Sequence, residues 1–358
     1  MSVLTGAGGV GKSSLTLTIA LSLAIGNNLL DLDNSDPAWK LHLDKPVGVH
    51  VYNLEDSMDE MKRRVVALLK YHEIPTSYMS GNLFFGDGMT DRLILASLHK
   101  DKIVRQPCVE ALIEALIAKN IKLLIVDPML KSHLLHENDN IHMDYVMVTL
   151  KYIAQQANCA VWLIHHSGKN ALDPTGSRGA SSIVAAARVA ECLSKPSNEE
   201  RSNLGLGKDV IKLDRVKENL AVSEDCQWLR IFGQPVGNGD DTYPEGDMGQ
   251  VIELAHSRDL TEQMNTIVFS GITNNIMAGP PNGEKCWRAM KTSANWIGNA
   301  FKDYISDRKL VDSILKHWKE TGLIQDCIVP GAQNKGTKGY EINPDKVAEI
   351  LAQKESVS

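Results

Sequence analysis

The sequence reads Gly6-Ala7-Gly8-Gly9-Val10-Gly11-Lys12-Ser13-Ser14 near its start, and this motif is the strongest indication of the fold. It matches the pattern GxxxxGK followed by Ser or Thr, between an apolar strand candidate and an apolar-faced helix candidate. Glycines let backbone N–H groups curl around a phosphate, and the helix N-terminus adds a positive dipole end. Lys12 would reach the β- and γ-phosphates, the Ser13 hydroxyl would bind Mg²⁺, and Ser14 would also lie at the nucleotide. A glycine-rich turn without a ligand is the alternative, and the strand and helix around the motif disfavour it.

Short apolar runs alternate with amphipathic stretches from residue 1 to about 232. The strand candidates are Ser2–Thr5, Val47–Leu54, Lys122–Val126, Ala160–Ile164, Val210–Val216 and Trp228–Phe232. The helix candidates are Gly11–Ile25, Met58–His72, Pro107–Asn120, Met143–Asn158 and Ser181–Leu193. Most of the strand runs are continuously apolar, which is typical of a sheet covered on both faces. The sequence therefore predicts an α/β domain over residues 1–232, with a mainly parallel β-sheet flanked by helices.

A carboxylate is expected to bind Mg²⁺ together with the Ser13 hydroxyl of the phosphate loop. Leu123–Val126 is an apolar run that ends in Asp127, which is the form of a Walker B segment. We expect Asp127 to hold Mg²⁺ through water. Pro128 follows it instead of Glu, so the carboxylate that activates water must come from another strand.

Glu55 is the leading candidate for that carboxylate, because it follows the strand Val49–Leu54 and would face the carboxyl edge of the sheet. Asp56 is its near rival. The alternative is that Glu55, Asp56 and Ser57 only cap the helix that follows, and for an isolated sequence the two interpretations are about equal.

Three further stretches extend the pattern, namely LIHHSGK from Leu163 to Lys169, GSRGASS from Gly176 to Ser182, and Lys217-Glu218-Asn219. With the loop and the two strands that end in carboxylates, they resemble the RecA-type ATPases. Within that group they look like the RepA-type hexameric replicative helicases and related AAA-family ATPases of plasmids and phages. The resemblance covers roughly residues 3–232. Only five residues precede the loop, whereas many ring helicases grip the next subunit through an N-terminal segment.

The resemblance implies an ATP- and Mg²⁺-dependent enzyme that acts on DNA and assembles into a ring or filament, with a hexamer as one form. It assigns Glu55 to activating water, Asp127 to the metal, and His166 to a sensor near the γ-phosphate. It also implies that Arg178 is an arginine finger offered to the neighbouring subunit and that Lys217 lies near the same interface. Without the resemblance, the histidine pair would be read as structural and Arg178 as a solvated charge.

The C-terminal part of the chain differs in composition. Residues 233–284 are rich in Gly, Pro, Asn and Asp and are interpreted as loops and a linker. Residues 285–358 carry 12 Lys and Arg against 9 Asp and Glu, although the whole chain has a net charge of -6. Helix candidates Trp287–Tyr304 and Asp307–Thr321, followed by a hairpin, predict a winged-helix-like DNA-binding domain. The proposed phosphate contacts are Lys316, Lys319, Lys335 and Lys338, and a protein-binding helical cap is the alternative.

Composition excludes other classes. The chain of 358 residues is 43% hydrophobic and 23% charged, as expected for about two globular domains. No apolar run approaches the roughly 20 residues of a membrane span, and the start lacks the pattern of a signal peptide. Six cysteines without CxxC spacing argue against a zinc ribbon, a redox pair or a disulfide framework, so a cytoplasmic protein is expected.

A non-motor ATP-dependent switch remains the alternative to the motor, as a helicase loader or a partition-type or regulatory ATPase that binds DNA or a protein. Partition ATPases carry a lysine early in the loop, where this chain has Ala7, and this difference favours the motor.

Overall fold

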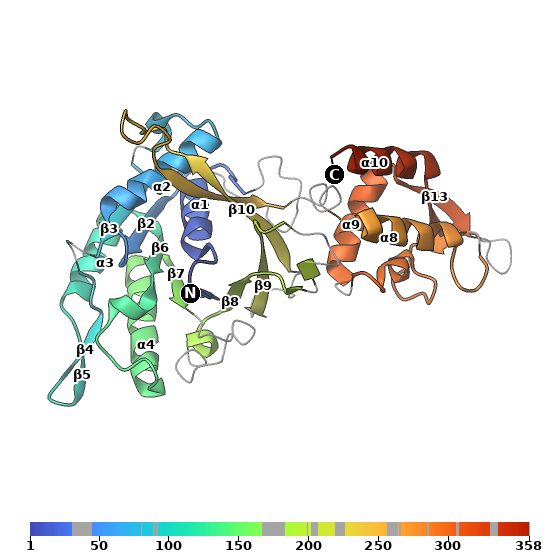
Figure 1. Cartoon of the computed structure of the whole chain (residues 1–358). Helices are drawn as coiled ribbons and strands as arrows, with labels where there is room; N and C mark the ends of the chain where they lie inside the picture. Colours follow the sequence, from blue (N-terminus) through green and yellow to red (C-terminus); the bar gives the residue numbers. More distant parts are fainter. Residues whose placement is uncertain are drawn as a thin grey trace. The chain divides into compact units, whose positions relative to one another are not determined.

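A computed structural model describes residues 1–30, 45–79, 81–88, 90, 92–166, 183–198, 200–201, 207–218, 226–255, 264, 266–284, 286–305, 308–329 and 336–357. The chain divides into two compact units (Figure 1). The α/β unit comprises Met1–Lys195 and Ile211–Leu254, and the C-terminal unit comprises Pro196–Val210 and Ala255–Ser358.

A nine-stranded sheet forms the centre of the α/β unit, in the order β11-β10-β9-β8-β1-β7-β6-β2-β3. Its strands are β1 Ser2–Gly6, β2 Gly48–Asn53, β3 Leu83–Asp87, β6 Ile121–Asp127, β7 Ala160–His166, β8 Val189–Ser194, β9 Val210–Glu218, β10 Gln227–Pro235 and β11 Met248–Leu254. The six strands from β3 to β8 in this order pair in parallel, so their carboxyl ends share one edge. β8 with β9, and β10 with β11, pair antiparallel.

Helices cover both faces of this sheet, as the continuous apolar runs predict. Leu124 and Val126 of β6 pack with helices α3 Cys108–Ala118 and α4 Asn140–Ala157, whereas Ile125 between them packs with α1 Lys12–Ile25 and α2 Met58–Tyr71. Side chains of a strand alternate between the two faces, so each face contributes to its own buried cluster. The predicted α/β fold with a mostly parallel sheet is confirmed.

Smaller elements complete the α/β unit. They are the 3-10 helices η2 Thr76–Met79 and η3 Met129–Ser132, and the hairpin of β4 Ala96–His99 and β5 Lys102–Arg105. No helix in the part of the chain that the structure describes is long and apolar enough to cross a membrane.

The structure corrects one helix that the sequence predicts for the α/β unit. A helix over Ser181–Leu193 is wrong, because only residues 183–186 of its described part are helical, and β8 begins at Val189. β8 pairs in parallel with β1 and antiparallel with β9. Sheet pairing on both sides outweighs the helix propensity of this alanine-rich stretch, because local propensity is worth only a fraction of a kcal/mol per residue, roughly 0–0.7.

The described part of 233–284 has more regular secondary structure than its composition predicts. β10 continues to Pro235, β11 pairs along it, and α8 spans Thr266–Ala278 with Phe269 and Ile272 fully buried. The glycine- and aspartate-rich residues form the connection between β10 and β11, and they do not form a linker. The two units therefore divide after Leu254, not near 279–284 as the composition indicates.

The C-terminal unit contains α8, β12 Trp287–Arg288, the 3-10 helix η4 Ile297–Phe301, α9 Arg308–Glu320, β13 Ile324–Val329, β14 Thr337–Ile342 and α10 Pro344–Val357. The predicted helix Trp287–Tyr304 is wrong, because this stretch forms a two-residue strand, turns and η4. The predicted helix Asp307–Thr321 corresponds to α9. Trp318 of α9 is fully buried, with its ring 5.7 Å from that of Phe269 and 5.3 Å from that of Phe301.

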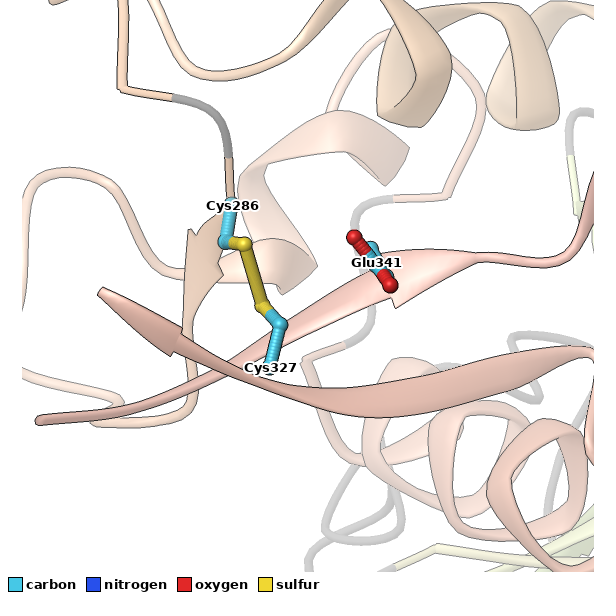
Figure 2. A group of neighbouring side chains, drawn as sticks. All are labelled: Cys286, Cys327 and Glu341. Atoms are coloured by element: carbon cyan, nitrogen blue, oxygen red, sulfur yellow. A yellow bond between two sulfur atoms is a disulfide. The ribbon is translucent and has the colours of Figure 1, made fainter.

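A three-stranded sheet in the order β12-β14-β13 accompanies these helices. It brings together Cys286 and Cys327, which form a disulfide (Figure 2) with their Cα atoms 6.6 Å apart. The expectation that the cysteines form no redox pair or disulfide framework is wrong for this pair. The two cysteines are 41 positions apart, and spacing rules detect only cysteines that are close in sequence. The other four, Cys108, Cys159, Cys192 and Cys226, are not part of a disulfide in the described residues.

Candidate nucleotide-binding site

The site lies at the carboxyl edge of the parallel strands. Register places Gly6 of β1 beside His166 of β7, and Asn53 of β2 beside Asp127 of β6. The phosphate loop follows β1 directly, and Glu55 follows β2. Residues from four parts of the sequence therefore meet at one edge, as expected for ligand sites in parallel α/β sheets.

The phosphate loop turns sharply into α1. Gly9 and Gly11 have φ values of 70° and 101°, in the left-handed region that favours glycine. A Cβ atom on Gly11 would also lie 2.6 Å from Cδ1 of Ile231, so a side chain at this position would force a shift. These two glycines let α1 begin at Lys12 with its N-terminus directed at the loop.

Lys12 is held inside the loop. Its Nζ donates to the carbonyl oxygens of Gly6 at 2.8 Å and Ala7 at 2.7 Å, and the side chain is only 4% exposed. Burial lowers the pKa of the Lys12 ammonium, and the nearby carboxylates of Asp127 and Glu55 oppose this effect. The carboxylates help to keep a cation where phosphate oxygens would bind.

Asp127 is also buried, with 6% exposure, and the hydroxyl of Ser13 donates a hydrogen bond to its carboxylate. Burial raises the pKa of Asp127, while the Ser13 hydrogen bond and the charge of Lys12 oppose that shift. A hydroxyl and a carboxylate are hard oxygen donors, which are the ligands that Mg²⁺ prefers. The Ser13–Asp127 pair fits the predicted metal site.

Ser14 is directed elsewhere. Its hydroxyl donates to Oε1 of Gln250 on β11 at 3.1 Å, and it is 4% exposed. The side chain of Ser14 therefore joins α1 to the sheet and does not contribute to the phosphate loop. A nucleotide contact by its backbone stays a prediction.

Glu55 and Asp56 occupy different environments. Glu55 Oε2 lies 3.8 Å from Nε2 of His166, and its Oε1 lies 3.5 Å from Nζ of Lys131. Asp56 instead pairs with Nη1 of Arg64 on α2, at 2.8 Å. The side chain of Asn53 accepts hydrogen bonds from the backbone N–H groups of both residues, which defines the turn.

Ser57, and not Glu55 or Asp56, caps the helix α2 that follows. Ser57 is the N-cap of α2, and its hydroxyl accepts a hydrogen bond from the N–H of Glu60. The capping role thus belongs to Ser57, Asp56 is tied to α2 by Arg64, and Glu55 is left facing His166.

His166 connects Glu55 to the phosphate loop. Its Nδ1 lies 3.2 Å from Nζ of Lys12. A neutral imidazole protonated on Nε2 would accept from Lys12 and present its N–H toward Glu55. Its neighbour His165 is 1% exposed, and burial lowers the pKa of His165 to about 4, so this histidine is a neutral core residue.

Sequence reasoning did not single out Lys131. This residue lies on η3, four positions after Asp127, and its ammonium pairs with Glu55. A basic residue soon after the Walker B aspartate was the available signal, but surface lysines are too common for this signal to be specific.

Comparison with known proteins agrees with this geometry. Residues 1–171, just under half of the chain, match the AAA domain family. The α/β unit has a RecA-like P-loop ATPase fold. In this ATPase unit β7 lies between β1, which precedes the phosphate loop, and β6, which is the Walker B strand. β2, which precedes Glu55, lies next to β6.

Three solved structures are similar to the chain at low identity. They are the RadB recombinase (12% identity over 64% of this chain and 86% of that chain, TM-score 0.40), a DnaB-like replicative helicase described with its interactions with primase (11%, 65% and 55%, TM-score 0.46), and the ATPase domain of a third protein (11%, 69% and 83%, TM-score 0.44). The chain thus spans about half the length of the DnaB-like helicase.

Lys217 of the ATPase unit has a structural environment. Its Nζ donates to the carbonyl oxygens of Val184 at 3.2 Å, Ala185 at 2.7 Å and Ala187 at 2.9 Å. The three N–H donors of the ammonium thus bind the end of the helical stretch 183–186 within the same chain. The interface role of Lys217 stays a prediction. Arg178 lies outside the described residues.

The lysines proposed to contact DNA differ in their surroundings. Lys316 on α9 is exposed. Lys319 and Lys338 both pair with Asp326, at 3.0 and 3.4 Å, and lie over the ring of Tyr340. One carboxylate thus offsets part of the charge of two lysines. Lys335 lies outside the described residues.

Proposed function

We propose that this protein is an ATP-hydrolysing RecA-fold motor that acts on DNA, of the kind found in RepA-like replicative helicases of plasmid- or phage-type elements. The observation that carries the proposal is the series of contacts from Lys12 through His166 to Glu55. It connects the residue that would bind the γ-phosphate to the residue that would activate water.

The chemistry follows from these positions. Lys12 would exchange its contacts with the Gly6 and Ala7 carbonyls for phosphate oxygens. Ser13 and Asp127 would hold Mg²⁺, which neutralises charge on the phosphates when bound. Glu55 would accept the proton of the attacking water. His166, between Glu55 and Lys12, would respond to the presence of the γ-phosphate.

A motor also needs contacts with DNA and with other subunits. The order α8-β12-η4-α9-β13-β14, with β12 added to the hairpin, supports the winged-helix interpretation of the C-terminal unit. α9 would then be the recognition helix and Lys316 a phosphate contact. Arg178 as an arginine finger would make hydrolysis depend on assembly into a ring or filament, of which a hexamer is one form.

A non-motor ATP-dependent switch is the second candidate, and the charge of the C-terminal unit favours it. Lys319 and Lys338 share the carboxylate of Asp326, so fewer free positive charges face a partner than the sequence suggests. A helicase loader or regulatory ATPase would use this unit to bind a protein instead of DNA.

One experiment separates the two functions. ATP hydrolysis is measured with and without DNA, and displacement of a labelled strand from a forked duplex is followed with the same protein. Lys12→Ala serves as the hydrolysis-deficient control. A motor gives DNA-stimulated hydrolysis and ATP-dependent displacement, both lost in Lys12→Ala. Hydrolysis without displacement over a range of fork designs would contradict the motor and favour the switch.

A further inference from the structure

The C-terminal unit brings three metal-ligand side chains to one place, far along the sequence from the ATPase motifs. Cys286 directly precedes β12, Cys327 lies on β13 and Glu341 lies on β14. Their ligand atoms all lie within 4.8 Å of one another (Figure 2). The proposed ATPase chemistry uses none of the three.

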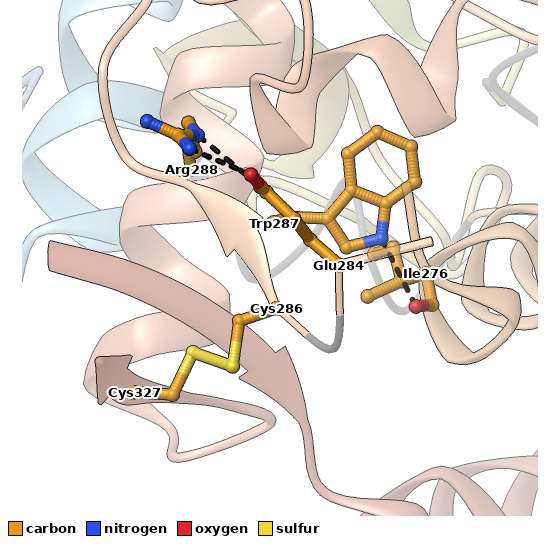
Figure 3. The surroundings of a disulfide bond; sticks show 6 residues. All are labelled: Ile276, Glu284, Cys286, Trp287, Arg288 and Cys327. Carbon is orange, nitrogen blue, oxygen red and sulfur yellow. Dashed lines mark hydrogen bonds and ion pairs between the residues drawn. A yellow bond between two sulfur atoms is a disulfide. The ribbon is translucent and has the colours of Figure 1, made fainter. Parts of the chain in front are cut away.

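The pairing of the strands explains why these side chains share a face. Gly339 and Glu341 are two positions apart on β14, so both lie on the same side of the sheet, and Gly339 is directly opposite Cys327. Trp287, the residue after Cys286, pairs with Tyr340. Cys286, one position before Trp287, therefore lies on the same face of the sheet as Glu341. It approaches from the β12 edge of β14, whereas Cys327 approaches from the β13 edge (Figure 3).

The surrounding residues anchor β12 at the site. The indole N–H of Trp287 donates to the carbonyl oxygen of Ile276 at 3.0 Å, and Arg288 pairs with Glu284 at 2.6 Å (Figure 3). A Cβ atom on Gly339 would lie 3.2 Å from Sγ of Cys327. The glycine thus leaves room for the sulfur, and β12, which directly follows Cys286, is held by Ile276 and Glu284.

The donor types match one metal. Zn²⁺ binds thiolate sulfur at about 2.3 Å and carboxylate oxygen at about 2.0–2.2 Å, so ligands of one ion lie roughly 4 Å apart. After reduction the two sulfurs are no longer bonded and must separate to reach that spacing, while the carboxylate oxygen, within 4.8 Å of both, needs to move by about 1 Å or less. Two thiolates and one carboxylate carry three negative charges, of which a divalent cation offsets two.

Access to the site differs among its members. Cys286 is 8% exposed, Cys327 is half-buried and Glu341 is exposed. An open cavity of about 530 Å³ is lined by Cys327 together with Asp326 and Lys338. The exposed carboxylate of Glu341 leaves the site open to solvent, so that an ion and a water ligand can reach it.

We propose that the reduced chain binds one Zn²⁺ through Cys286, Cys327 and Glu341, with water as the fourth ligand. The disulfide and the metal are alternatives, because bonded sulfurs cannot act as thiolates. A water-soluble phosphine reduces the disulfide: it attacks one sulfur, the S–S bond breaks, and water supplies oxygen to the phosphine oxide and one proton to each thiolate. The metal binds in a separate step. The two thiols release these protons when the metal binds.

The test uses the full chain and Co²⁺ as a spectroscopic probe. After reduction with phosphine and its removal under inert gas, one equivalent of Co²⁺ should produce thiolate-to-metal charge-transfer absorption with tetrahedral d–d bands. Zn²⁺ should displace it. The unreduced chain should give neither band.

Variants assign the ligands. Cys327→Ser should lose the charge-transfer band. Glu341→Gln should weaken binding at least about tenfold, because even changes to residues that only orient a ligand cost about 10–100-fold in affinity. Cys159→Ser and Glu349→Gln, a half-buried cysteine and an exposed glutamate elsewhere in the chain, should bind as the unmodified chain does.

Several results would overturn the proposal. They are a reduced chain without charge-transfer absorption, a band that persists undiminished in Cys327→Ser, and unchanged affinity in Glu341→Gln. Glu341 is exposed, so its variant should fold normally, which far-ultraviolet circular dichroism verifies. Metal binding is measured by absorption and does not depend on ATP hydrolysis. A negative result for this site can therefore be distinguished from a negative result for the proposed ATPase function.

Discussion

The assignment of the water-activating carboxylate gives the sharpest prediction. Glu55→Gln keeps the shape of the side chain but removes its charge and its ability to accept a proton. General-base catalysis contributes about 10²–10⁴ in rate, so the turnover number should fall by that factor, or about 3–5 kcal/mol in activation free energy. Glu55 is 43% exposed, so its ion pairs with His166 and Lys131 should contribute about 1 kcal/mol or less to folding.

Asp56→Asn is the matched control. It removes the neighbouring charge and the ion pair with Arg64, although Arg64 keeps its contact with Glu60 at 2.9 Å. Hydrolysis should stay within about twofold of the unmodified protein, and the free energy of unfolding should fall by about 1 kcal/mol or less.

The two variants are compared by steady-state phosphate release, by binding of a fluorescent ATP analogue and by urea unfolding. Glu55→Gln should retain nucleotide binding and stability while losing turnover. The reasoning fails if Asp56→Asn loses turnover and Glu55→Gln does not, because the contact with His166 would then not mark the catalytic carboxylate.

Three further predictions follow from particular contacts. Lys217→Met removes three hydrogen bonds to backbone carbonyls, so urea unfolding should show a loss of about 1–3 kcal/mol; unchanged stability would favour the interface role alone. Lys316→Ala should reduce the slope of log K against log salt for duplex binding by about 0.9, and an identical slope would remove Lys316 from the DNA contacts. Burial lowers the pKa of His133 and His165 to about 4, below the ordinary 6.5, so the unfolded chain binds more protons between these values. The free energy of unfolding should therefore decrease from pH 7 to pH 5, by at least about 1 kcal/mol, and a flat profile would contradict neutral buried histidines.

The region beyond residue 232 shows how composition misleads. The residues between β10 and β11 have the composition of a linker, yet they form the connection of a strand pair. Apolar residues of β11 and α8, which follow this connection, are buried. The helix expected over 287–304 fails for a related reason, because its apolar residues, including Ile297 and Phe301, are buried from turns and a 3-10 helix. Apolar residues in a sequence predict that a segment packs in a core. They do not identify the backbone conformation that brings the side chains there.

The phosphate loop, the Walker B strand and the parallel sheet could be predicted from the amino-acid sequence. These features depend on residues that are adjacent in the chain, where glycine conformation, apolar runs and a terminal carboxylate act over a few positions. Only the tertiary structure separated Glu55 from Asp56 and brought Cys286 to Cys327. Both outcomes depend on which strands lie side by side and in what register. That choice is made by packing between segments that are distant in sequence, so no local pattern contains it.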